Sequence, residues 1–199
     1  MNHPPQLDEL VAAAQEMGAR RAEVVPTGIL TVKTAAWAKC FIPACKFYGS
    51  SIMCPPHNPL KPEITRRIVG EYQWGVLFQL MAEVEDFVGD QWRTRHVPTE
   101  LKHKEMVAEL EGRAFAMGYP LAMGFAAGEC SLCVPRQECT VLAGDECRHP
   151  LRARPAMEAC GFDVFTIMKT MGWPMAPIGH RCRAEQVPCA SLVGLVLVV

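Results

Sequence analysis

Ten cysteines in a chain of 199 residues are the feature that most restricts how this sequence can fold. The first five residues, Met1 to Pro5, contain neither the basic segment nor the apolar segment of a secretion signal. We therefore expect a cytoplasmic protein, in which thiols stay reduced and a dense cysteine pattern indicates metal or redox chemistry. The even number of cysteines also permits a disulfide framework, and the sequence leaves this alternative open.

Composition limits the size of the fold and the kinds of partner. Half of the residues are hydrophobic, which is enough for a buried core, so we expect one metal-binding domain spanning residues 1–199. The net charge is −1, and no basic excess indicates a nucleic-acid partner. The longest apolar run, residues 190–199, is about half as long as a membrane helix, so we expect no membrane partner. This run predicts a buried strand.

Hydrophobic periodicity predicts alternating helices and strands. Helices are expected at residues 7–17, 62–72, 99–117 and 163–172, with Thr99 and Asp163 as caps of the last two. Strands are expected at residues 22–26, 28–32, 74–84, 121–126 and 190–199. This order predicts an α/β (or α+β) fold in which a single sheet is layered with helices. Two long cysteine-rich loops, residues 39–59 and 128–150, each follow a predicted strand and precede a predicted helix.

The second loop contains four cysteines within eighteen residues: Cys130, Cys133, Cys139 and Cys147. The close pair places two thiolates on one turn, and the other two complete a tetrahedral set for zinc or for an iron–sulfur cluster. Structural zinc sites usually have two close pairs, whereas here one pair is followed by two single cysteines. The uneven spacing, with Pro135 and Pro150 near the ligands, favours a [4Fe–4S] cluster, and zinc is the alternative.

The first loop supplies only three thiolates, from Cys40, Cys45 and Cys54. It is compatible with a second [4Fe–4S] cluster, with zinc bound by three cysteines and a histidine, or with three inert buried cysteines. The candidates for a fourth ligand are Cys160, Cys182, Cys189, His57 and His180. Neighbouring arginines favour a thiolate at Cys182, and Cys160 is equally compatible with a structural role. We expect an open or exchangeable fourth position.

Two groups of motifs resemble a known family. The first contains Lys39-Cys40, Cys45, Tyr48-Gly49 and Cys54-Pro55-Pro56. The second contains Gly128-Glu129-Cys130-Ser131-Leu132-Cys133, Cys147-Arg148-His149-Pro150, Arg154-Pro155 and the segment from Glu158 to Val164. Together they resemble the predicted metal-binding proteins catalogued as domain of unknown function 2284, over nearly the whole chain. The resemblance implies metal binding through these cysteines as iron–sulfur clusters, and it implies no particular reaction.

These patterns predict electron transfer, or an accessory redox role, with a redox partner protein. The glycine-rich motifs of nucleotide sites and the serine motif of hydrolases are absent. Arg148, Arg152 and Arg154 beside the second loop form either a docking surface for an acidic partner or a solvated face. The alternatives are an enzyme that uses an open iron on the first centre as a Lewis acid, and a zinc-binding structural protein. The sequence does not decide whether the protein is an enzyme or which oligomeric state it adopts.

Overall fold

A four-stranded antiparallel sheet lies at the centre of the computed structural model, which describes residues 3–133, 138–179 and 181–199. The strand order is β1-β2-β4-β3. The strands are β1 (Arg21–Pro26), β2 (Trp74–Ala82), β3 (Met123–Phe125) and β4 (Ala190–Leu197). The two central strands pair from Gly75 with Leu197 to Ala82 with Ala190. Both are almost continuously apolar because both of their faces are covered.

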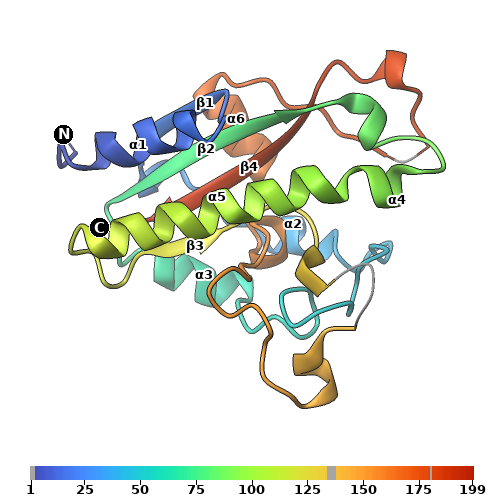
Figure 1. The fold of residues 1–199 in the computed structure, drawn as a ribbon, viewed down its shortest axis with the longest axis horizontal. Helices are drawn as coiled ribbons and strands as arrows, with labels where there is room; N and C mark the ends of the chain where they lie inside the picture. The colour runs from blue at the N-terminus through green and yellow to red at the C-terminus, as the bar shows by residue number, and fades with distance from the viewer. Residues whose placement is uncertain (1–2, 134–137, 180) are drawn as a thin grey trace.

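Helices cover both faces of this sheet (Figure 1). Helices α1 (Leu7–Glu16) and α5 (Val97–Ala116) pack on one face, and α3 (Pro62–Val69) and α6 (Val164–Met171) on the other. Two shorter helices are α2 (Thr34–Ala38) and α4 (Trp92–Arg95). Short 3-10 turns occupy Thr27–Ile29, Val84–Asp86, Ser131–Cys133, Thr140–Ala143, Glu158–Cys160 and Ala184–Gln186. The predicted single sheet layered with helices is confirmed. No helix in the described ranges is both long and apolar enough to cross a membrane.

Alternation along the central strands divides the interior into two cores. Phe78 and Val196 point into the core beneath α1 and α5. Leu77 and Leu195 point the other way, into a core that also contains Phe162. This is the expected behaviour of strands, in which successive side chains leave opposite faces. The two cysteine loops lie at one end of this layered structure, side by side below α5 (Figure 1), and add few residues to either core.

Two local predictions are wrong. Residues 28–32 do not form a strand: Thr27–Ile29 is a 3-10 turn, in which the Leu30 N–H donates to the Thr27 carbonyl, and Val32 makes only an isolated bridge. The first cysteine loop therefore follows helix α2 and not a strand. Helix α5 begins at Val97 and Thr99 does not cap it, because a proline is well tolerated in the first helical turn.

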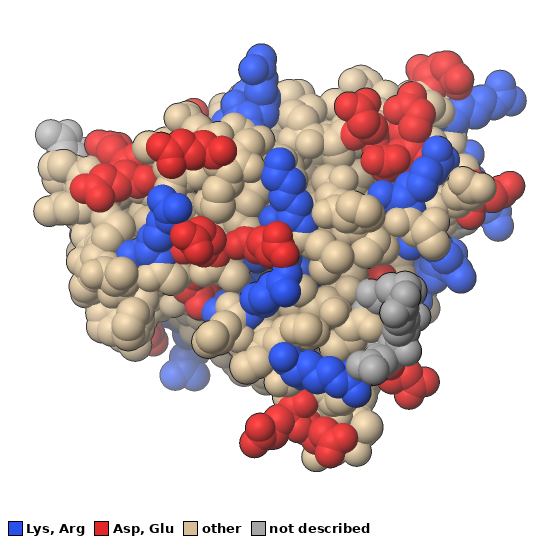
Figure 2. All heavy atoms as spheres, in the orientation of Figure 1, with Lys and Arg blue, Asp and Glu red and all other residues tan. Residues whose placement is uncertain are grey.

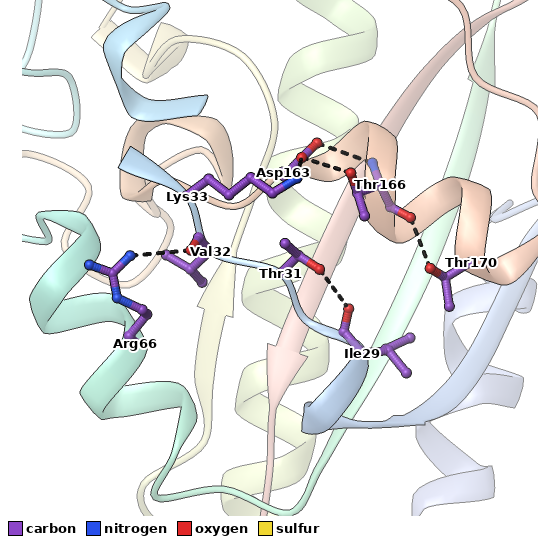
Figure 3. A network of polar contacts seen from close by, with 8 residues as sticks. All are labelled: Ile29, Thr31, Val32, Lys33, Arg66, Asp163, Thr166 and Thr170. Carbon is purple, nitrogen blue, oxygen red and sulfur yellow. Dashed lines mark hydrogen bonds and ion pairs between the residues drawn. The ribbon is translucent and has the colours of Figure 1, made fainter. Parts of the chain in front are cut away.

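Polar contacts hold the chain just before the first cysteine loop (Figure 3). The Lys33 ammonium lies 2.7 Å from the Asp163 carboxylate, and the Arg66 guanidinium donates to the Val32 carbonyl at 3.2 Å. The carboxylate of Asp163 also accepts from the Thr166 N–H at 3.1 Å, so this residue is the N-cap of α6, as predicted. Helices α3 and α6 thereby fix the position of the segment that leads into the loop.

His103 of α5 is buried in the first core without a hydrogen bond. Both ring nitrogens lack a partner within the described residues, and the ring centroid lies 5.2 Å from that of Phe78. The close approach needs Gly194 on β4, where a Cβ would come within 3.0 Å of the His103 ring. Burial, with a smaller effect of Lys104, lowers the pKa of His103 from 6.5 to about 3.

His103→Leu is expected to stabilise the protein, and to do so more strongly in acid. Removing an unsatisfied buried imidazole is worth about 1–3 kcal/mol. Below pH 6.5 the unfolded chain binds a proton at this position that the folded chain excludes. The free energy of unfolding of the wild type therefore falls by about 1.4 kcal/mol for each unit by which the pH is lowered. The difference between the two proteins should therefore grow by about 2 kcal/mol from pH 7.5 to pH 5 in urea unfolding. Groups shared by both proteins cancel, and a pH-independent difference would contradict the prediction.

Candidate metal centre

The four cysteines of the second loop line one cavity. Its volume is about 180 Å³, and its wall contains all four thiols. A single water needs only about 10–15 Å³ of such space, so the cavity has room for a group of several atoms. The backbone N–H of His149, two residues beyond Cys147, donates to the sulfur of Cys147 at 3.4 Å. Pro135, noted in the sequence, lies outside the described residues.

The three cysteines of the first loop line a second cavity. Its volume is about 440 Å³, and Cys40, Cys45 and Cys54 lie on its wall together with Tyr48 and Glu158. Cys54 is buried, and its sulfur lies 3.7 Å from the Ser50 hydroxyl. Thus each loop encloses its own cysteine-lined space.

Each loop contributes residues to the cavity of the other. Ser50, Ser51 and Ile52 of the first loop form part of the wall of the second-loop cavity. Conversely, Gly128 at the start of the second loop lines the first-loop cavity, and Glu129 lines both. The backbone around Glu129 therefore forms a wall common to the two cavities. Spacing in the sequence gave no sign of this proximity, because the loops are separated by helices and strands.

The candidate fourth ligands that the structure describes are not among the residues lining the first-loop cavity. Cys160 is fully buried in the second core, where the Asn58 amide lies 3.5 Å from its sulfur. Its chain neighbours Glu158 and Ala159 line the first-loop cavity, so Cys160 lies just behind that wall. Cys182 follows a turn in which its N–H donates to the Gly179 carbonyl. Cys189 and His57 line neither of the two cavities. His180 lies outside the described residues.

Burial shifts two of these thiols, Cys40 and Cys130, away from the thiolate form that binds metal. It raises the pKa of Cys40 to about 12, and the neighbouring Cys45 and Cys54 thiols add to the effect. It raises the pKa of Cys130 to about 11, although the Leu132 N–H and Lys104 act in the opposite direction. Since the thiolate is the ligand, metal binding here must release protons.

A buried polar cluster, which the sequence reading missed, lies between helix α5 and the second loop. Lys104 is fully buried and donates to the Ala127 carbonyl at 2.9 Å. Glu100, one turn earlier, accepts from the Ser131 hydroxyl at 3.4 Å, and its Oε2 lies 3.8 Å from the His96 Nε2. A Cβ at Gly128 would collide with the Glu100 carboxylate, so a glycine is needed there. Lys104 and Glu100 lie four residues apart on the helix, and this spacing was the one available signal.

Burial raises the pKa of three carboxyl groups in this region. Burial raises the pKa of Glu100 to about 7, opposed by Lys104 and by the Ser131 hydroxyl. Burial, with the nearby Glu100 carboxylate, also raises the pKa of Glu129 to about 7. Burial likewise raises the pKa of Glu158 beside the first loop. The space between the loops is therefore poorly solvated, so charges there interact strongly.

Of the three arginines at the end of the second loop and just after it, two are paired with helix α5. Arg152 forms an ion pair with Glu105, and Arg154 forms one with Glu111. These pairs hold the end of the loop against the helix. Figure 2 shows acidic and basic side chains interspersed over one face of the molecule, and the described residues visible there form no continuous basic surface.

The donor set fits a metal cofactor. Seven thiols line the two cavities, and thiolates are the usual ligands of zinc and of iron–sulfur clusters. Within the described ranges, no three His, Cys, Asp or Glu side chains lie close enough together to hold a single ion.

The fold and these cavities define a cysteine-rich protein built on one antiparallel sheet, with paired loops suited to metal. The chain belongs to the family described as predicted metal-binding protein (DUF2284), whose model matches residues 23–198. The resemblance seen in the sequence motifs is thereby confirmed. No curated protein and no solved structure matches the chain.

Proposed function

We propose that this protein binds two iron–sulfur clusters and transfers electrons to and from a redox partner protein. The observation that carries the proposal is the pair of cysteine-lined cavities that share the wall at Glu129. The second cavity would hold its cluster through Cys130, Cys133, Cys139 and Cys147, and the first through Cys40, Cys45 and Cys54. A [4Fe–4S] cluster supplies one-electron chemistry, and its neighbouring residues set its potential.

The size of the cavities supports clusters over single zinc ions. Zinc binds four ligands at about 2.0–2.3 Å and needs its thiolates drawn tightly together. The cysteines here surround about 180 Å³ in one loop and about 440 Å³ in the other. Spaces of this size have room for a multi-atom cluster.

Anaerobic purification followed by iron, zinc and acid-labile sulfide analysis tests the proposal. We expect a brown protein with iron and sulfide in equal amounts and broad absorption in the visible range. A colourless protein with zinc and no iron would overturn the proposal and favour a structural zinc role.

A second candidate is an enzyme with an open iron at the first centre. A cavity of about 710 Å³ lies against the outer side of this loop, lined by Cys40, Cys45 and the largely apolar start of α6. This volume is within the usual range of small-molecule sites, about 300–1,000 Å³. Adding small thiols or carboxylates to the protein should change the magnetic resonance spectrum of one cluster if this candidate is correct. A pure carrier would cycle reversibly and show no such change.

A further inference from the structure

Lys104 occupies an unusual position between the two cysteine loops. It projects from helix α5 and is fully buried, and the Ala127 carbonyl lies 2.9 Å from its ammonium. An ammonium has three N–H donors, and the Ala127 contact is the one hydrogen bond that Lys104 makes within the described residues. Its other two N–H groups are therefore available to hydrogen-bond acceptors of a bound metal group. Lysine is rarely buried without such a reason.

Burial lowers the pKa of Lys104, and acidic groups from three segments act in the opposite direction. Glu100 comes from its own helix, and Glu129 and Cys130 come from the second loop. Cys54 comes from the first loop. The ammonium is bonded to Ala127, directly before Gly128 and Glu129, which line the cavities, so it lies behind the wall that the two cavities share. Lys102, on the same helix, is exposed to solvent instead.

A positive charge in this position has a definite consequence for electron transfer. Thiolate-bound clusters are negatively charged, and each reduction adds one more negative charge. A buried cation stabilises the reduced form more than the oxidised form, since burial weakens screening by water. Resting on the proposed function, we propose that Lys104 is a counter-charge shared by both centres that raises the reduction potential of each. Lys104 is thus a positioning and tuning residue, not a metal ligand.

Redox titration of the purified protein tests the inference. Dithionite supplies one electron to each centre, no bond is made or broken, and magnetic resonance distinguishes the two centres. Lys104→Met should lower both potentials, by at least tenfold in the reduction equilibrium, which is about 59 mV for a one-electron couple. Lys102→Met, on the exposed face of the same helix, is the matched control and should shift neither potential.

A second variant protects the test against misfolding. Glu100→Gln removes the carboxylate one turn away on the same helix and keeps a side chain of the same shape, so both potentials should rise at a pH where Glu100 is ionised. Unchanged potentials in both variants, with the clusters present, would overturn the inference alone. A shift confined to one centre would overturn the shared role. Absence of iron and sulfide from the wild type would overturn the proposed function and the inference with it.

Discussion

Cys133→Ser is expected to remove the second centre and to leave the first in place. Cys133 belongs to the close pair that fixes two thiolates on one short turn, and serine does not replace a thiolate in a cluster. The iron content should fall by roughly half, with a parallel loss of sulfide. Metal and sulfide analysis of the anaerobic variant provides the measurement.

The structural consequence should be local. Among the described residues from 138 to 150, Thr140 alone is buried, so the loop has little apolar packing of its own. In such a loop the free energy of metal binding is also the free energy of ordering. Amide hydrogen exchange from 129 to 150 should become roughly a hundredfold faster, which corresponds to about 2.7 kcal/mol in the free energy of local opening. The amides of the sheet should remain protected from exchange.

Cys189→Ser is the matched control for this variant. Cys189 directly precedes β4 and lines neither cysteine cavity, so its replacement should retain all of the iron. Full iron content in the Cys133 variant would contradict the assignment of Cys133 as a ligand. Loss of both centres would contradict the expectation that each loop holds its own centre despite the common wall.

Cys54→Ser is expected to abolish the first centre and spare the second. Cys54 is buried on the wall of the first cavity, whereas Cys160 lies in the second core behind it. The Asn58 amide at 3.5 Å and the pKa of Cys160, raised by burial to about 12, both hold that residue as a thiol. Cys160→Ser should therefore keep full iron content, because serine preserves the contact with Asn58.

Cys182→Ser gives a second comparison for the same centre. The sequence made Cys182 a candidate through its flanking arginines, yet it does not line the first cavity. We expect this variant to retain both centres and an open fourth position on the first. Loss of the first centre in the Cys160 or Cys182 variant would identify a protein ligand, and would favour electron transfer over catalysis.

The sequence predicted the elements whose signals are local. The apolar run from Ala190 forms β4, and Asp163 and Gly172 begin and end α6 as the cap residues indicate. The strand expected at residues 28–32 failed because a short apolar stretch is equally compatible with a turn. The Thr27 hydroxyl donates to the carbonyl of Tyr72, a residue distant in the sequence, and this hydrogen bond helps to hold the turn.

What the sequence determined by itself is the set of metal-binding groups: four cysteines in one loop and three in another, in motifs of a family of predicted metal-binding proteins. The sequence is sufficient for this because the types of ligand and their spacing within one loop are set by the order of residues along the chain. Only the tertiary structure decided that the two loops share a wall at Glu129 and that Lys104 is buried beside both. The reason is physical: packing of α5 against the sheet determines which distant segments meet, and no periodicity in the sequence records where a charged side chain is removed from water.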